Sequence, residues 1–98
     1  MVGGFGEVSL PSEQGKVILE SVKEAVEAKQ GKTYTTFHPT HMRTQVVAGT
    51  NYLFKVFCND GDIIHVKVHK PLNYPQEPAV LMSILPFQLT DTPLDYFE

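Results

Sequence analysis

The chain has 98 residues, a formal net charge of −3 at pH 7 and 19% charged residues. This length predicts a single domain, residues 1–98, because a second core would have too little chain to build it. There is no basic stripe to neutralise phosphates and no run of about eighteen apolar residues, so neither nucleic acid nor a membrane is an expected partner.

Cys58 is the only cysteine, so no disulfide can form within the chain. A single thiol fits a reducing compartment better than the secretory pathway. The first residues, MVGGFGEVSLPSE, also lack the basic start and long apolar run of a secretory signal. We therefore expect a cytoplasmic protein.

The first predicted elements are an arm and a helix. Residues 1–11 are rich in glycine and show no clear period, which predicts a flexible or extended N-terminal arm outside the core. Ser12 can cap a helix, and apolar residues then recur at a helical period. The members of this stripe are Ile18, Val22, Ala25 and Val26. Gly31 suits the left-handed residue that ends a helix, so one helix is predicted between Ser12 and Gly31.

Beyond Gly31 the apolar period changes to two, which indicates strands. Residues 33–47 combine threonine, aromatic and valine side chains and predict a long strand. Pro39 cannot donate a ladder hydrogen bond, so a bulge or a sheet edge is expected there. Two more strands are expected at residues 52–58 and 64–69, where side chains again alternate.

The Asp60-Gly61 step between these two strands is a strong signal for a hairpin. Residues 70–79 are interrupted by prolines and predict a loop, and residues 80–89 predict one further strand. The expected fold class is therefore α+β, with a single N-terminal helix packed on an antiparallel sheet of four to five strands.

The histidines and the cysteine do not form a convincing reactive or metal-binding group. His65 and His69 would share a strand face, but four residues along a strand separate them by roughly 13 Å, too far for one metal ion. His38 and His41 fall on alternate faces. A catalytic pair of Cys58 with His65 is conceivable across the hairpin, but nothing marks an oxyanion hole or a third group. No metal, cofactor or catalytic residue is expected, and Cys58 is interpreted as a small apolar residue at a strand end.

The stretch QVVAGTNY, residues 45–52, lies between two of the predicted strands and carries no charge. One interpretation is an ordinary hairpin turn, because glycine-containing turns between β-branched strands are common. The other is a loop shaped to enter the cleft of another protein, with Ala48 and Gly49 at its tip. The eight residues alone favour the ordinary turn.

Taken with its surroundings, this motif resembles the cystatins, which are inhibitors of papain-like cysteine proteases. The similarity is to the stefins in particular, the short intracellular branch without disulfides or a signal peptide. It extends over nearly the whole chain: a glycine near the amino terminus, a helix, the Gln-Val-Val-Ala-Gly motif, TNYLFKV, HVKVHKPL and an aromatic Tyr96-Phe97 pair near the end. The order and spacing of these segments make the match specific.

The resemblance implies three protease-binding segments. In stefins, a glycine marks an N-terminal arm that lies along the substrate subsites of the protease. The spacing places this glycine at Gly3, with Gly4 as a rival, and makes Val2 the apolar residue that fills a subsite. The first loop corresponds to Gln45, Val46, Val47, Ala48 and Gly49. The second loop corresponds to Leu72, Asn73, Tyr74 and Pro75, where the family usually has Leu-Pro followed by a polar or small residue.

The resemblance implies reversible, competitive, tight-binding inhibition of papain-like cysteine proteases such as cathepsins, with the arm and the two loops as a wedge in the active-site cleft. Small and β-branched side chains suit a narrow cleft and leave few charges to desolvate. A monomer is expected. Stefin-like proteins are prone to exchange halves through the first loop, so a domain-swapped dimer is an expected side product. The alternative is a noncatalytic interaction module of the same fold, and an enzyme is not expected.

Overall fold

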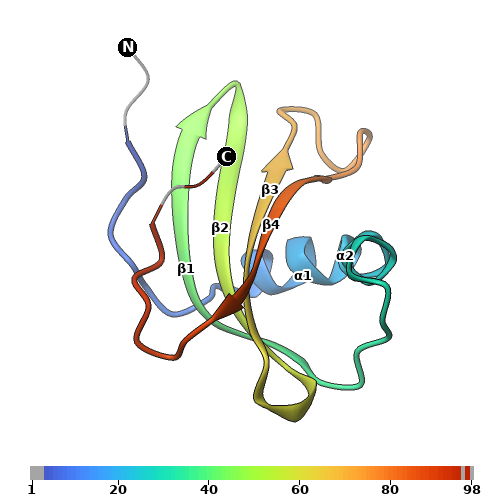
Figure 1. Cartoon of the computed structure of the whole chain (residues 1–98). Helices are drawn as coiled ribbons and strands as arrows, with labels where there is room; N and C mark the ends of the chain where they lie inside the picture. Colours follow the sequence, from blue (N-terminus) through green and yellow to red (C-terminus); the bar gives the residue numbers. More distant parts are fainter. Residues whose placement is uncertain (1–3, 96, 98) are drawn as a thin grey trace.

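The computed structural model describes residues 4–95 and 97, which form two helices and one four-stranded sheet (Figure 1). In chain order the elements are α1 (Glu13–Ser21), α2 (Lys23–Gln30), β1 (Phe37–Val47), β2 (Gly49–Cys58), the short 3-10 turn η1 (Asn59–Gly61), β3 (Ile63–Lys70) and β4 (Val80–Gln88). The sheet is antiparallel throughout, with the strand order β1-β2-β3-β4. Both helices cross one of its faces, which confirms the α+β class.

The helical segment begins and ends as expected but is interrupted once. The Ser12 hydroxyl accepts a hydrogen bond from the Gly15 amide at 3.0 Å, and Gly31 ends α2 in the left-handed conformation, with φ of 68°. The prediction of a single helix is wrong at Val22, where φ is −107° and ψ is 6°. The Val22 amide bonds to the Leu19 carbonyl three residues back, at 3.1 Å, which tightens the turn and separates α1 from α2.

The core lies between the helices and the facing side of the sheet. Ile18, Val22 and Val26 are buried there as the helical stripe predicts, but Ala25 is exposed. The helical period does not continue unbroken through Val22, and Leu19, which the predicted stripe did not include, is buried in the core. On the sheet, the core consists mainly of Tyr52, Phe54, Val56, Cys58, Ile64, Val66 and Val68.

The first strand is shorter than predicted because residues 33–36 bond to a side chain instead of a strand. The Asn59 Oδ1 accepts from the Thr36 amide at 2.7 Å, and its Nδ2 donates to the Thr33 carbonyl at 3.0 Å. β1 therefore begins at Phe37. The expected bulge is present, because the pairing of β1 with β2 shifts register between Pro39 and His41.

The segment after β4 lies against the face of the sheet that the helices leave open, and Figure 1 shows it turning across the lower part of β1 and then running beside that strand. The Lys55 Nζ donates to the carbonyls of Thr90 and Thr92 at 2.8 and 2.5 Å, and Leu94 is buried. This segment thus covers part of the second face of the sheet. No helix among the described residues has the length and apolar character needed to cross a bilayer.

Candidate functional site

The two predicted loops lie side by side at one end of the sheet. Val47 pairs with Gly49 across the β1–β2 turn, and Thr50 pairs with Lys70, the last residue of β3. The antiparallel register therefore places the end of β3, and the loop that follows it, beside the turn. Figure 1 shows both loops at the upper end of the molecule, opposite the β2–β3 hairpin.

Gly49 determines how closely the two loops approach. Its φ of 102° lies in the region that L side chains rarely adopt, and the residue is buried. A Cβ at this position would overlap the Lys70 carbonyl oxygen and lie 3.2 Å from the Leu72 amide nitrogen. Ala48 alone forms the exposed tip, so the expectation that Gly49 shares the tip is wrong. The glycine is required because another strand passes directly against it.

The exposed side chains of the first loop are apolar. Val46 is 79% exposed and Ala48 is also exposed, whereas Gln45 and Val47 are partly buried. Removing exposed valine side chains from water is favourable, and they carry no charge to desolvate. This end of the hairpin is therefore suited to burial against another protein.

The second loop adds one more exposed apolar side chain, Leu72, which is 79% exposed. The next residues hold the loop together: Asn73 donates to the Glu77 carboxylate at 3.1 Å, and its carbonyl accepts from Gln76 at 2.8 Å. Tyr74 packs partly against the core, and the Tyr74-Pro75 peptide bond is cis. Of the four predicted second-loop residues, Leu72 thus offers the largest apolar contact.

The described part of the predicted arm runs along β1 toward the two loops (Figure 1). The Gly6 amide donates to the Thr44 carbonyl at 2.8 Å, and Ser9 and Met42 exchange two backbone hydrogen bonds of 2.9 Å. Gly4 is exposed at the start of this stretch. Val2, Gly3 and the aromatic Tyr96 of the stefin-like pattern lie outside the described residues.

Arg43, which the sequence reasoning missed, ties this stretch to the sheet. Its guanidinium donates to the carbonyls of Gly6, Phe5 and Leu94 at 2.7, 3.2 and 2.9 Å. Arg43 also approaches the Asp95 carboxylate at 3.4 Å. A charged side chain in the middle of a predicted strand was the one available signal. The five donors of a guanidinium suit it to such multiple contacts.

The conceivable Cys58–His65 pair is absent, because the two side chains lie on opposite faces of the sheet. Cys58 belongs to the helix-facing core, whereas His65 pairs with Lys55 on the other face. Burial raises the pKa of the Cys58 thiol to about 11, so it is no nucleophile at neutral pH. Among the described residues, no three His, Cys, Asp or Glu side chains lie close enough together to hold a metal ion.

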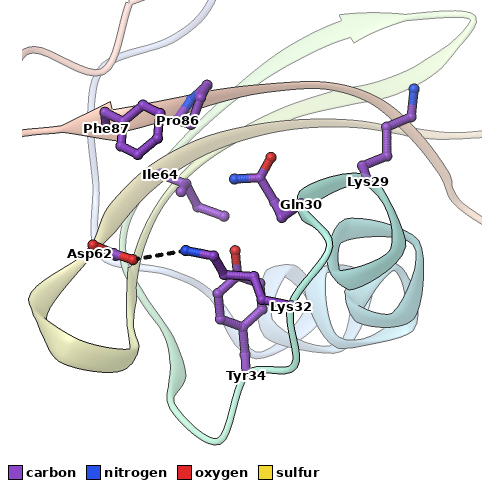
Figure 2. Close-up of a pocket in the computed structure, with 8 residues that line it drawn as sticks. All are labelled: Lys29, Gln30, Lys32, Tyr34, Asp62, Ile64, Pro86 and Phe87. Carbon is purple, nitrogen blue, oxygen red and sulfur yellow. Dashed lines mark hydrogen bonds and ion pairs between the residues drawn. The ribbon is translucent and has the colours of Figure 1, made fainter.

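A pocket of about 150 Å³ lies at the other end of the molecule, away from the two loops (Figure 2). The Lys32 ammonium and the Asp62 carboxylate approach each other to 3.2 Å within it, and Tyr34 forms part of its wall. It is smaller than most ligand sites, which occupy roughly 300 Å³ or more. The candidate site is therefore the loop end and not this pocket.

Known proteins resemble this chain over nearly its whole length. Residues 3–84 match the Cystatin domain family. The chain is 32% identical to Stefin-C from Bos taurus over 96 residues, which covers 98% of this chain and 95% of that protein. It is 38% identical to Cystatin-A from Homo sapiens over 79 residues, or 81% of each chain. It is 34% identical to Leukocyte cysteine proteinase inhibitor 1 from Sus scrofa over 83 residues, covering 85% of this chain and 81% of the other.

Proposed function

The chain belongs to the cystatin family, and we propose that it is a reversible, competitive, tight-binding inhibitor of papain-like cysteine proteases such as cathepsins. The resemblance to the stefins is confirmed, and with it the prediction that the chain is not an enzyme. One of its relatives carries cysteine proteinase inhibition in its name.

The observation that carries the proposal is the shared position of three exposed apolar residues at one end of the sheet. Val46 and Ala48 come from the β1–β2 turn and Leu72 from the β3–β4 loop, and the buried Gly49 lets the two loops meet. We call the three exposed residues, Val46, Ala48 and Leu72, the apolar edge. It is thin, uncharged and built on paired strands, as a wedge for a narrow cleft must be.

The inhibitor acts by occupation of the cleft. Because the edge is already ordered by the strand register, its docking costs less conformational entropy than the docking of a flexible substrate. The interface would be of ordinary size, roughly 1,600 Å² in total. Val2, Gly3 and Gly4 extend the contact along the substrate subsites, and Gln45, Val47, Asn73, Tyr74 and Pro75 support the edge or border it.

The setting of the inhibitor is part of the proposal. It acts as a single-domain monomer in the cytoplasm, where its one thiol, buried at Cys58, needs no partner. The alternative, a noncatalytic interaction module that uses the same edge for another protein, requires the same geometry but no effect on proteases. The two functions therefore differ in what happens to protease activity.

Titration of papain tests the proposal. We expect loss of activity in proportion to added protein until the two are equimolar, with the inhibitor recovered uncut. Binding should persist when the papain thiol is blocked with a small group, because the edge offers no peptide bond to the nucleophile. Unchanged papain activity would favour the interaction module, and cleavage within residues 45–49 in proportion to inhibition would indicate a substrate-like mechanism.

Two exposed valines provide a matched pair of variants for this titration. Val46→Asp places a charge in the apolar edge, and Val17→Asp places the same charge on α1, where Val17 is 58% exposed. Burial of an unpaired carboxylate is costly, so V46D should weaken inhibition by at least about a hundredfold. V17D should inhibit like the unchanged protein, and equal losses in the two variants would contradict the assignment of the edge.

A further inference from the structure

A row of polar side chains crosses three strands just below the β1–β2 turn. Gln45 on β1 pairs with Asn51 on β2, and Asn51 pairs with His69 on β3. Directly opposed residues project from the same face of a sheet, and this is the face away from the helices. The row lies two residues from Val47 and Gly49, the pair that closes the turn.

The hydrogen bonds of this row have a defined direction. The Asn51 Nδ2 donates to the Gln45 Oε1 at 3.1 Å, which turns the Asn51 Oδ1 toward the ring of His69. The His69 Nδ1 lies 2.7 Å from that oxygen. An amide oxygen can only accept, so Nδ1 carries the hydrogen in this arrangement. A neutral imidazole in water prefers the hydrogen on Nε2, so the row selects the less common tautomer.

The ring of His69 also lies against the turn itself. Its Cε1 is 3.1 Å from the position that a Cβ on Gly49 would take. One side chain thus lies beside the glycine that lets the loops meet and, through Asn51, is linked to Gln45, the first residue of the first loop. His69 also lies three residues before Leu72, the exposed apolar residue of the second loop.

We propose that His69 is a positioning residue for the apolar edge, because its Nδ1–H fixes Asn51 and Gln45 and its ring supports Gly49. The inference rests on the proposed function for its effect on a protease. Its effect on the free protein, the ordering of the turn, can be measured without any protease. His69 holds the two loops in register and makes no contribution to the chemistry of the target.

Three variants separate the hydrogen bond from the packing of the ring. His69→Phe keeps an aromatic ring beside Gly49 and removes the donor. His69→Asn keeps a donor close to the position of Nδ1, because its amide nitrogen is joined to the backbone through the same number of bonds. His41→Phe makes the same change at an exposed histidine whose Nδ1 lies 3.0 Å from a hydroxyl of its own strand, that of Thr40.

For the unchanged protein, nitrogen chemical shifts of the His69 ring at pH 8 should show a hydrogen on Nδ1. In H69F, amide exchange of residues 46–49 should accelerate about tenfold, and dissociation from papain should accelerate by a similar factor, since one such hydrogen bond is lost. H69N should restore both rates in large part, and H41F should change neither. Urea unfolding should show that all three variants remain folded.

Specific results would overturn the inference. A neutral ring with its hydrogen on Nε2, or unchanged exchange of residues 46–49 in H69F, would show that His69 does not order the turn. Failure of the unchanged protein to inhibit papain would instead contradict the proposed function, and the tautomer and exchange measurements would still decide the role of His69. Equal dissociation rates for H69F and the unchanged protein, with faster exchange in H69F, would show that turn order does not limit binding.

Discussion

Gly49 is the residue on which the geometry of the apolar edge depends most. The sequence suggested a glycine in a hairpin turn, which is a local reason. The structure adds a non-local one, because the Lys70 carbonyl occupies the space that a side chain would take. Gly31 and Gly61 have positive φ as well, at 68° and 79°, but a Cβ at either would meet nothing within 4 Å. All three glycines thus have a backbone conformation that favours glycine, but only at Gly49 does a neighbouring strand also exclude a side chain.

Gly49→Ala and Gly31→Ala should therefore differ. Gly31→Ala places a side chain at positive φ in open space and should cost about 1–2 kcal/mol in the free energy of unfolding. Gly49→Ala adds an overlap with β3 and should cost roughly 1–3 kcal/mol more. It should also weaken papain inhibition by about tenfold or more, whereas G31A should inhibit normally. Urea unfolding and papain titration measure both effects, and equal unfolding costs would rule out the close contact.

His65 is a buried histidine that the proposed function does not use. It is 1% exposed, and its Nε2 has no hydrogen-bond partner among the described residues. Burial and, to a lesser extent, the nearby Lys55 lower the pKa of His65 from 6.5 to about 4, while Asp95 acts in the opposite direction. The folded protein therefore keeps this imidazole neutral over a pH range in which the unfolded chain already binds a proton.

Stability should fall as the pH is lowered from 6.5 toward 4. The folded pKa lies below the unfolded value, so His65 supports the fold fully above pH 6.5, and this support is lost as the pH falls toward about 4. The slope from this group is at most about 1.4 kcal/mol per pH unit. His65→Leu removes the group and should flatten the dependence of the unfolding free energy on pH between 7 and 4.5. The same slope in both proteins would contradict a neutral, buried His65.

At the scale of elements, the sequence was informative where the cause is local. The Ser12 cap, the Gly31 end and the Asp60-Gly61 hairpin each depend on residues a few positions apart, and all three are present. The start of β1 was misjudged because Asn59, distant in sequence, bonds to residues 33–36. The segment of residues 89–95 has no periodic pattern, and its contacts with Lys55 and Arg43, distant in sequence, hold it on the sheet.

Arg43 joins the N-terminal stretch, the sheet and the C-terminal segment, so its removal should loosen both ends. Arg43→Ala should accelerate amide exchange at Gly6, lower the unfolding free energy by about 1–2 kcal/mol and raise the rate of dissociation from papain. Lys16→Ala is the control, because Lys16 forms an ion pair with the exposed Glu13 three residues away, and an exposed pair of this kind contributes little to stability. Hydrogen exchange measured by mass spectrometry would show the difference. An R43A protein with unchanged exchange at Gly6 would mean that the stretch is held by other contacts.

At the scale of the whole molecule, each loop could be predicted from the sequence, but the contact between the two loops could not. The Gln-Val-Val-Ala-Gly motif predicted the first loop, and the proline-rich stretch predicted the second. Their contact depends on the Thr50–Lys70 register and on a buried glycine, which no local pattern specifies. The row of Gln45, Asn51 and His69 was invisible for the same reason, because its members are neighbours only in the sheet.

The β1–β2 turn should also control exchange of halves between two chains. If the turn opens, β1 and β2 can form one long strand, and each β1 can pair with β2 of the other chain. Gentle heating should therefore produce a dimer that lacks the turn and does not inhibit papain. Chromatography followed by titration of each peak measures this. A dimer with full inhibitory capacity per chain would mean that residues 45–49 are not both the hinge and the wedge.

The location of the protease interface is the central claim, and mapping the interface by NMR tests it most directly. The isotope-labelled chain would be titrated with papain whose thiol is blocked by a methylthio group. We expect the largest amide shifts at residues 46–49 and 72–74, with little change at Asp62 and Phe87, which line the pocket at the other end (Figure 2). Shifts centred on that pocket, or no shifts with an active inhibitor, would contradict the claim that the apolar edge enters the cleft.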